Sequence, residues 1–138
     1  MTQSAANLFE EALKNYENGA TPEELIPVFK DICKQVPKSP PAWSCLAWLY
    51  LLNSEPEKAL KAAKKGHKLD PNSLQGRINL VLAMLETGQS GVRQHIEAVQ
   101  EVIAMGGETR RDVEENIQDG LKRKPDWKAL ERVKNWLL

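Results

Sequence analysis

Residues 40–71, PPAWSCLAWLYLLNSEPEKALKAAKKGHKLDP, form the stretch that decides the predicted fold. Its first half has an apolar helix face spaced at i, i+3, i+4 and i+7, made up of Trp43, Leu46, Ala47 and Tyr50. Its second half begins with a capping-box sequence at Ser54. Small residues that let another helix approach closely then recur on one side of that half, namely Ala59, Ala63 and Gly66. The stretch therefore predicts a helical hairpin, in which large residues of one helix pack against small residues of the next.

The same pattern repeats along the chain at intervals of 34 residues. One interval separates Phe9 from Trp43, and another separates Tyr50 from Met84. The pattern resembles the tetratricopeptide repeat (TPR), a helical hairpin with the motif W-x2-L-G-x2-Y followed by a small residue and a proline. The resemblance implies an all-α fold, a right-handed superhelix of antiparallel helix hairpins that forms a TPR-like α-solenoid. The expected single domain spans 1–138, with about three repeats at about 6–39, 40–73 and 74–107 and C-terminal capping helices at 108–138.

The C-terminal residues 108–138 also have helical periodicity, for example in the spacing of Val113 and Ile117. Because a solenoid needs a terminal element over the open end of its core, we expect these residues to cap the repeats. The alternative is that the tail tryptophans, Trp127 and Trp136, bind a partner. The short chain and its C-terminal segment KPDWKALERVKNWL are similar to small TPR proteins of cyanobacteria, some of whose relatives help to assemble photosynthetic complexes.

The overall charge is balanced, with 19 basic and 19 acidic side chains. This balance argues against a dedicated nucleic-acid binder, whose affinity depends on a basic surface. The two cysteines, Cys33 and Cys45, are too few for a disulfide framework, so we expect reduced thiols in a cytoplasmic protein. Because no apolar run approaches the roughly 18 residues of a transmembrane helix, we expect no membrane insertion.

The TPR resemblance further implies a concave groove, which the first helix of each repeat lines. A partner helix or peptide would bind there, and the matching positions are Glu10, Lys14, Ser44, Trp48, Leu51, Gln75, Ile78, Leu82 and Leu85. Trp48 is central to this prediction, because the other face of its helix is already used in packing between helices. The alternative is that the C-terminal helices fold back over the groove and bury its apolar residues.

These features predict a non-catalytic protein–protein interaction module that acts as an adaptor or a complex-assembly factor. The partner would be another protein. One alternative is a self-associating structural protein, a homo-oligomer held by the groove or the tail tryptophans. Another is contact with phosphate or nucleic acid through the basic side of residues 56–69, which carries Lys58, Lys61, Lys64, Lys65, His67 and Lys68. The main interpretation of that basic side is a solvated outer face.

The sequence offers little chemistry for an enzyme. It contains no CxxC, no HExxH and no glycine-rich phosphate loop. The two histidines, His67 and His95, lie in different repeats, and we expect His95 to be exposed. A metal site needs three or four convergent ligands, which the sequence does not suggest. We therefore expect no catalytic residues, no cofactor and no metal site.

Overall fold

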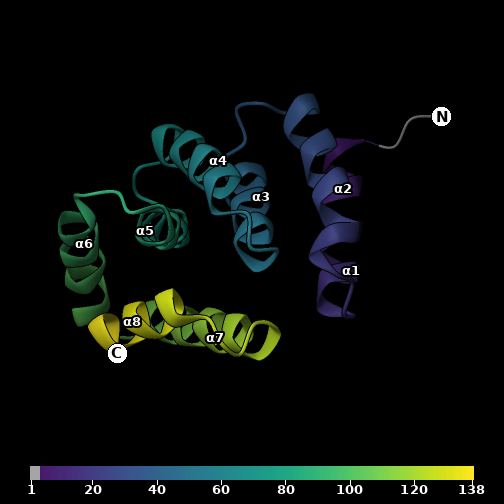
Figure 1. Ribbon diagram of the computed structural model, residues 1–138. Helices are drawn as coiled ribbons and strands as arrows, with labels where there is room; N and C mark the ends of the chain where they lie inside the picture. Colours follow the sequence, from purple (N-terminus) through teal and green to yellow (C-terminus); the bar gives the residue numbers. More distant parts are fainter. Residues whose placement is uncertain (1–3) are drawn as a thin grey trace.

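The computed structural model describes residues 4–138, and within that range the secondary structure is entirely α-helical. The helices of this range are α1 (Ala5–Glu17), α2 (Pro22–Gln35), α3 (Pro40–Leu52), α4 (Pro56–Leu69), α5 (Leu74–Thr87), α6 (Val92–Ala104), α7 (Glu108–Arg123) and α8 (Lys128–Leu137). Helices that follow one another in the sequence pack against one another in space (Figure 1). The fold class is thus all-α, as predicted. In the part of the chain that the structure describes, no helix combines the length and the apolar character needed to cross a membrane.

The hairpin of α3 and α4 lies at the centre of the molecule and has the predicted packing of large residues against small ones. Ala59 and Ala63 of α4 are fully buried. A side-chain carbon added at Gly66 would lie 3.4 Å from the Cβ atom of Trp43, so the two helices approach closely at that point. Such a carbon would be in ordinary van der Waals contact, so the position has room for a small residue and little more. Because α4 also packs against α5, the small residues let α4 lie between two neighbours.

Side-chain caps begin four of the eight helices of residues 4–138, and the cap predicted for α4 is wrong. Thr21 forms the full capping box before α2, and the Ser39 hydroxyl accepts a hydrogen bond at the start of α3. Ser54, predicted to cap α4, instead has a left-handed φ of 58° and follows the end of α3. The residue before a proline is disfavoured in helical conformation, so Glu55 becomes the flanking residue and α4 begins at Pro56. Gly91, with a φ of 95°, precedes α6 and makes no side-chain cap.

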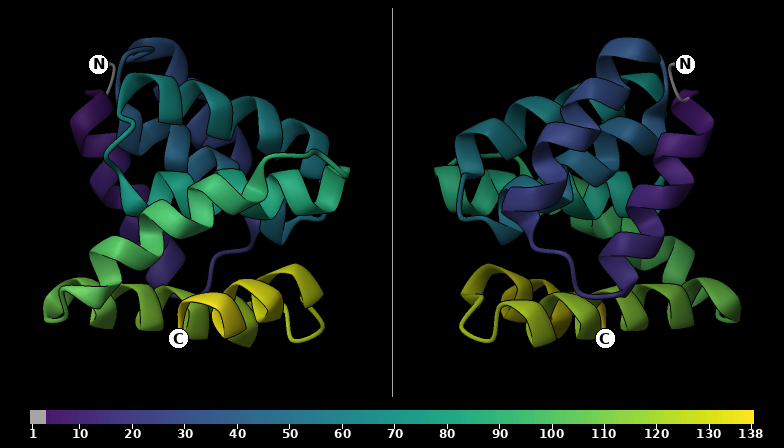
Figure 2. Two further views of the ribbon diagram at one scale, coloured as in Figure 1. Left: turned by 90° about the vertical axis from the view of Figure 1, so that its left-hand side faces the viewer. Right: turned by 90° about the vertical axis from the view of Figure 1, so that its right-hand side faces the viewer.

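The last two helices fold back as a hairpin along one side of the molecule. Figure 2 shows α7 and α8 lying below the other helices in both views. α8 packs against α5 and α6, and α7 packs against α6 and α8. Trp127, which precedes α8, is 1 % exposed, and Leu130 and Val133 of α8 are also buried. The C-terminal hairpin therefore belongs to the same hydrophobic core as the preceding helices.

Candidate functional site

The C-terminal hairpin covers much of the predicted groove. Leu51, Ile78 and Leu82, which were expected to offer apolar contact to a partner, are fully buried in the core. The alternative was that the C-terminal helices fold back over the groove, and α8 does pack against α5, which carries Ile78 and Leu82. The physical reason is that α8 brings its own apolar face to α5, where Leu82 lies. Burial of this face removes apolar surface from water without needing a partner.

Trp48 of α3, the centre of the predicted groove, also meets the C-terminal hairpin. Its ring packs against Trp127 with the ring centroids 5.2 Å apart. Its indole N–H donates a hydrogen bond of 2.9 Å to the phenol oxygen of Tyr16 in α1. A side-chain carbon at Gly120 of α7 would lie 2.8 Å from the outer edge of the Trp48 ring. Trp48 is therefore a junction between α1, α3 and α7 and not a free anchor.

Polar side chains at the end of α7 fasten the hairpin to α1 and α3, and we call Asp119, Arg123 and Lys124 the α7 latch. The Tyr16 hydroxyl donates a hydrogen bond to the Asp119 carboxylate, and Arg123 donates to the same carboxylate and to the Tyr16 carbonyl, each at 2.9 Å. The Arg123 guanidinium lies over the Tyr16 ring, 3.6 Å from its centroid. Lys124 donates to the carbonyl of Leu51 at 2.9 Å. Two cations thus meet the negative C-terminal ends of α1 and α3, which is electrostatically favourable.

The Tyr16 phenol remains a hydrogen-bond donor at any physiological pH. Burial raises the pKa of Tyr16 well above its usual value, and the hydrogen bond to Asp119 raises it further. The hydrogen bond from Trp48 and the charge of Arg123 act in the opposite direction but do not reverse the rise. Because Tyr16 stays protonated, it can link Trp48 to Asp119 continuously.

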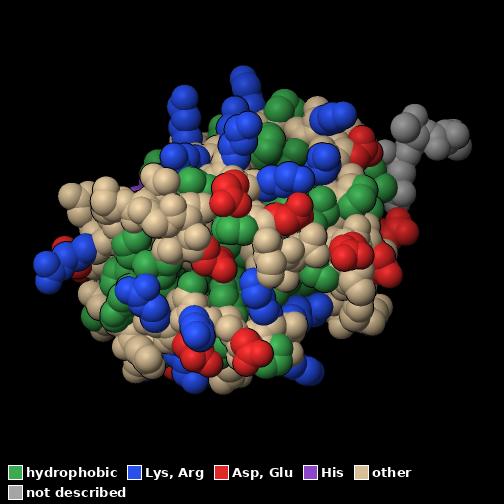
Figure 3. Space-filling model, in the orientation of Figure 1, with side chains coloured by type: hydrophobic (Ala, Val, Ile, Leu, Met, Phe, Trp, Pro, Cys, Tyr) green, Lys and Arg blue, Asp and Glu red, His purple; other side chains and the backbone are tan. Residues whose placement is uncertain are grey.

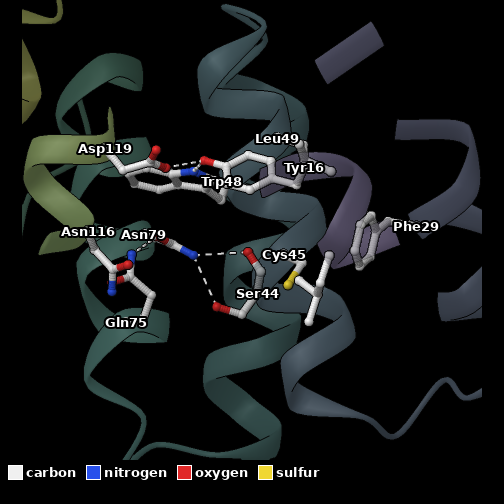
Figure 4. A pocket seen from close by; sticks show the side chains of 11 residues that line it. Tyr16, Phe29, Ser44, Cys45, Trp48, Leu49, Gln75, Asn79, Asn116 and Asp119 are labelled. Carbon is white, nitrogen blue, oxygen red and sulfur yellow. Dashed lines mark hydrogen bonds between the residues drawn. The ribbon is translucent and has the colours of Figure 1, made fainter. Parts of the chain in front are cut away.

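A pocket remains open beside Trp48, with a cavity volume of about 170 Å³ (Figure 4). Its apolar lining residues are Leu13, Phe29, Cys45, Trp48 and Leu49, and its polar ones are Tyr16, Ser44, Gln75, Asn79, Asn116 and Asp119. The pocket therefore joins α1, α2, α3, α5 and α7. Its mixture of apolar surface with a few polar groups is typical of ligand and peptide sites.

The polar wall of the pocket is held by a chain of amide hydrogen bonds that runs from α7 through α5 to α3. The Asn116 side chain donates to Gln75 at 2.9 Å, and Gln75 donates to the Asn79 oxygen at 2.7 Å. The Asn79 amide donates to the carbonyl and the hydroxyl of Ser44 at 3.0 and 3.1 Å (Figure 4). Asn79 is 1 % exposed, so its orientation is fixed by these partners. The wall is rigid before any ligand arrives, which lowers the entropic cost of binding.

The predicted groove residues divide into three groups in the structure. Ser44, Trp48 and Gln75 line the pocket. A second group, Leu51, Ile78 and Leu82, is buried in the core. The third group does not line the pocket and consists of Glu10, Lys14 and Leu85. Glu10 borders a shallow hollow near the start of α1, Lys14 is exposed, and Leu85 lies in a separate hollow beside Trp136.

Sequence reasoning missed Asn79 and the residues of α7 that complete the pocket. For Asn79 a signal was present, because a lone amide within the apolar run INLVLAML of α5 needs hydrogen-bond partners when it is buried. For Asn116 and Asp119 there was none, since their contacts depend on how α7 docks.

The two cysteines, Cys45 at this pocket and Cys33 on the opposite face of α3, are poor nucleophiles. Burial raises the pKa of the Cys33 thiol to about 11, and burial together with the neighbouring Cys33 raises that of Cys45 to about 12. Both thiols are therefore protonated at neutral pH, whereas nucleophilic attack requires the thiolate. Across residues 4–138, no three His, Cys, Asp or Glu side chains come together as metal ligands. The arrangement of the pocket suits non-covalent binding.

The two histidines come together, although the sequence placed them in different repeats. The His67 ring, near the end of α4, meets the His95 ring of α6 edge to face, with centroids 5.3 Å apart. Their Nδ1 atoms are buried and have no hydrogen-bond partner within the described residues. The expectation that His95 is exposed is therefore wrong, because it is half-buried against His67.

We expect this histidine pair to make the fold less stable in acid. Burial lowers the pKa of both His67 and His95, and the nearby Arg77 charge lowers them further. The unfolded chain then binds protons more readily than the folded one. The stability that the neutral histidine pair contributes is therefore fully present above the unfolded pKa of about 6.5 and is lost as the pH falls. Between neutral and acidic pH, the melting temperature should fall further for the wild type than for the double variant His67→Gln/His95→Gln. Equal drops would show that other groups control the acid response.

A comparison with models of known protein families finds no match, and a comparison with curated proteins finds none either. The TPR resemblance therefore rests on the residue pattern of 40–71 and its recurrence along the chain, and the family assignment stays a prediction.

Proposed function

We propose that this chain is a non-catalytic protein-binding module of the TPR type, a right-handed superhelix of antiparallel helix hairpins whose C-terminal hairpin narrows the concave face to one pocket. The observation that carries the proposal is the pocket between α1, α3, α5 and α7, which has an apolar side and a pre-ordered amide wall. A partner segment would bind there, and the module would serve as an adaptor or an assembly factor. The free thiols Cys33 and Cys45 support a reducing, cytoplasmic location.

The dimensions and chemistry of the pocket favour one large apolar side chain of a partner peptide. A cavity of about 170 Å³ is small for a whole helix but suits a single leucine, methionine or phenylalanine side chain. Trp48 and Leu49 would contact that side chain, and desolvated aromatic pockets are where binding energy concentrates at interfaces. Gln75 and Asn116, at the polar wall, would pair with the peptide groups on either side of the anchor.

Leu13→Glu is expected to remove binding while leaving the fold intact. Leu13 lies at the pocket and is 37 % exposed, so a glutamate there costs little stability but brings a charge beside an apolar cavity. Peptides selected by phage display against the wild type should share one large apolar residue. Their affinity, measured by calorimetry, should fall at least about tenfold for Leu13→Glu, which corresponds to about 1.4 kcal/mol.

Lys14→Glu is the matched control for this experiment, because Lys14 is the next residue of α1, is exposed and does not line the pocket. It should bind the selected peptides as the wild type does. The proposal fails if selection yields no peptide, or if the selected peptides bind Leu13→Glu and the wild type equally well.

A further inference from the structure

A second groove lies on the opposite face of α3, and we call it the lysine groove. Trp43, Leu46 and Tyr50 of α3 form its floor, whereas Ser44 and Trp48 of the same helix face the pocket described above. The groove is larger than that pocket, with a cavity volume of about 690 Å³. Its rim is basic on both sides and is formed by Lys30, Lys34, Lys58, Lys61 and Lys65.

The floor of the lysine groove is open to solvent at Trp43, whereas Leu46 and Tyr50 are buried beside it. The helix-face pattern predicted that Trp43 is a packing residue, but the structure leaves it only half-buried. A hydrogen bond of 2.8 Å from the Trp43 indole N–H to the carbonyl of Pro37 fixes the ring in place. The backbone of α4 at Gly66 holds the Cβ end of Trp43 from the other side. The exposed aromatic surface is thus rigid and needs no rearrangement before it can bind.

The charges of the rim are only partly compensated, because the Glu55 carboxylate interacts with Lys58 and, more weakly, with Lys30. Lys58 forms an ion pair of 3.2 Å with Glu55, but the other four lysines of the rim form no ion pair with any described residue. No carboxylate lines the groove. Figure 3 shows Lys and Arg side chains gathered over α2 and α4, with hydrophobic side chains exposed between them. Since the whole chain has a net charge of zero, this is a local concentration of positive charge.

We propose that the lysine groove binds an acidic amphipathic helix of a partner protein. The apolar face of that helix would pack on Trp43 and on the aliphatic parts of the rim lysines, and its flanking glutamates and aspartates would meet lysines on both sides. Lys58, Lys61 and Lys65 share one face of α4 and extend over about 10 Å, which is the length of about two helical turns. An amphipathic helix laid in an apolar groove is a common mode of recognition, and complementary charge gives it specificity and orientation.

The shape of the groove favours this partner over other anionic ligands. The phosphate backbone of a nucleic acid has no apolar face that would cover the floor formed by Trp43, Leu46 and Tyr50. An anionic bilayer presents a broad surface, whereas the lysines here stand on two walls contributed by α2 and α4. A helix of two or three turns satisfies both the apolar floor and the two basic walls. The proposal does not depend on the concave pocket, because α3 separates the two sites.

The test uses a synthetic helical peptide with leucine and phenylalanine at i, i+3, i+4 and i+7 and glutamate on both flanks. A second peptide replaces every glutamate with lysine. In titrations followed by fluorescence anisotropy, the wild type should bind the glutamate peptide and not the lysine peptide. The charge reversal Lys34→Glu/Lys61→Glu, with one residue on each wall, should weaken binding at least about tenfold, because like charges then face each other.

Lys64→Glu/Lys68→Glu is the matched control, since it makes the same charge change on exposed α4 residues outside the groove. This variant and Leu13→Glu should bind the glutamate peptide as the wild type does. The proposal is overturned if the glutamate peptide does not bind, if both double variants lose binding equally, or if Lys34→Glu/Lys61→Glu has no effect. It is also overturned if vesicles containing phosphatidylserine, or a single-stranded oligonucleotide, bind the groove in place of the peptide.

Discussion

Trp127→Ala is expected to lower the free energy of unfolding by about 3–5 kcal/mol, because it removes a large, fully buried ring. Trp127 is 1 % exposed and lies where the C-terminal hairpin meets the body of the molecule. Its ring packs against Trp48, and the Lys124 ammonium lies 5.1 Å from its centroid. Truncation would leave a cavity at this junction and also remove the surface against which Trp48 rests. Chemical denaturation followed by far-UV circular dichroism measures the loss.

Trp136→Ala is the control for this experiment, because Trp136 is 38 % exposed. Its ring lies beneath the guanidinium of Arg132, a neighbour on the same helix. The free energy of unfolding of Trp136→Ala should fall by about 1 kcal/mol or less. If both tryptophan variants lose the same small amount, the C-terminal hairpin is not docked on the body in the way described. The slope of free energy against denaturant should also stay unchanged in Trp127→Ala if the whole chain unfolds as one unit.

The sequence predicted the helices well because each one carries its own local signals. Apolar periodicity identified the helices, and small residues identified where α4 is approached by its neighbours. The error at Ser54 concerns only a helix start, where the following proline decided that α4 begins at Pro56. Local chemistry therefore predicts the elements and leaves uncertainty of one or two residues at their ends.

The concave side could be predicted only in part, because its closure depends on contacts between distant residues. Ser44, Trp48 and Gln75 line one pocket, whereas the other predicted groove residues do not line it. The α7 latch joins residues 103 and 107 positions apart in the chain, from Tyr16 to Asp119 and to Arg123. Helical periodicity and capping motifs are local patterns, so they do not predict contacts between residues this far apart in the chain. The lysine groove has the same origin, since the lysines of α2 and α4 face each other only after both helices pack on α3.

Gly120→Val is expected to lower the free energy of unfolding by about 2–3 kcal/mol through overpacking. At an open helix position, replacing glycine improves helix propensity by up to about 1 kcal/mol. At Gly120 the replacement should destabilise the fold, because a side-chain carbon there would lie 2.6 Å from a methyl group of Leu130 and 2.8 Å from the Trp48 ring. The methyl group could rotate away, but the indole is held by its hydrogen bond to Tyr16 and by Trp127.

The matched control for Gly120→Val is Gln118→Val, on the exposed side of the same helix, where valine costs only a few tenths of a kcal/mol in helix propensity. Denaturation curves of the two variants isolate the steric effect from the effect of a β-branched residue in α7. If Gly120→Val is as stable as Gln118→Val, the close contact of α7 with Trp48 does not exist in solution. If it is less stable by the expected amount, the contact is real, and the size of residue 120 limits how closely the C-terminal hairpin approaches the concave face.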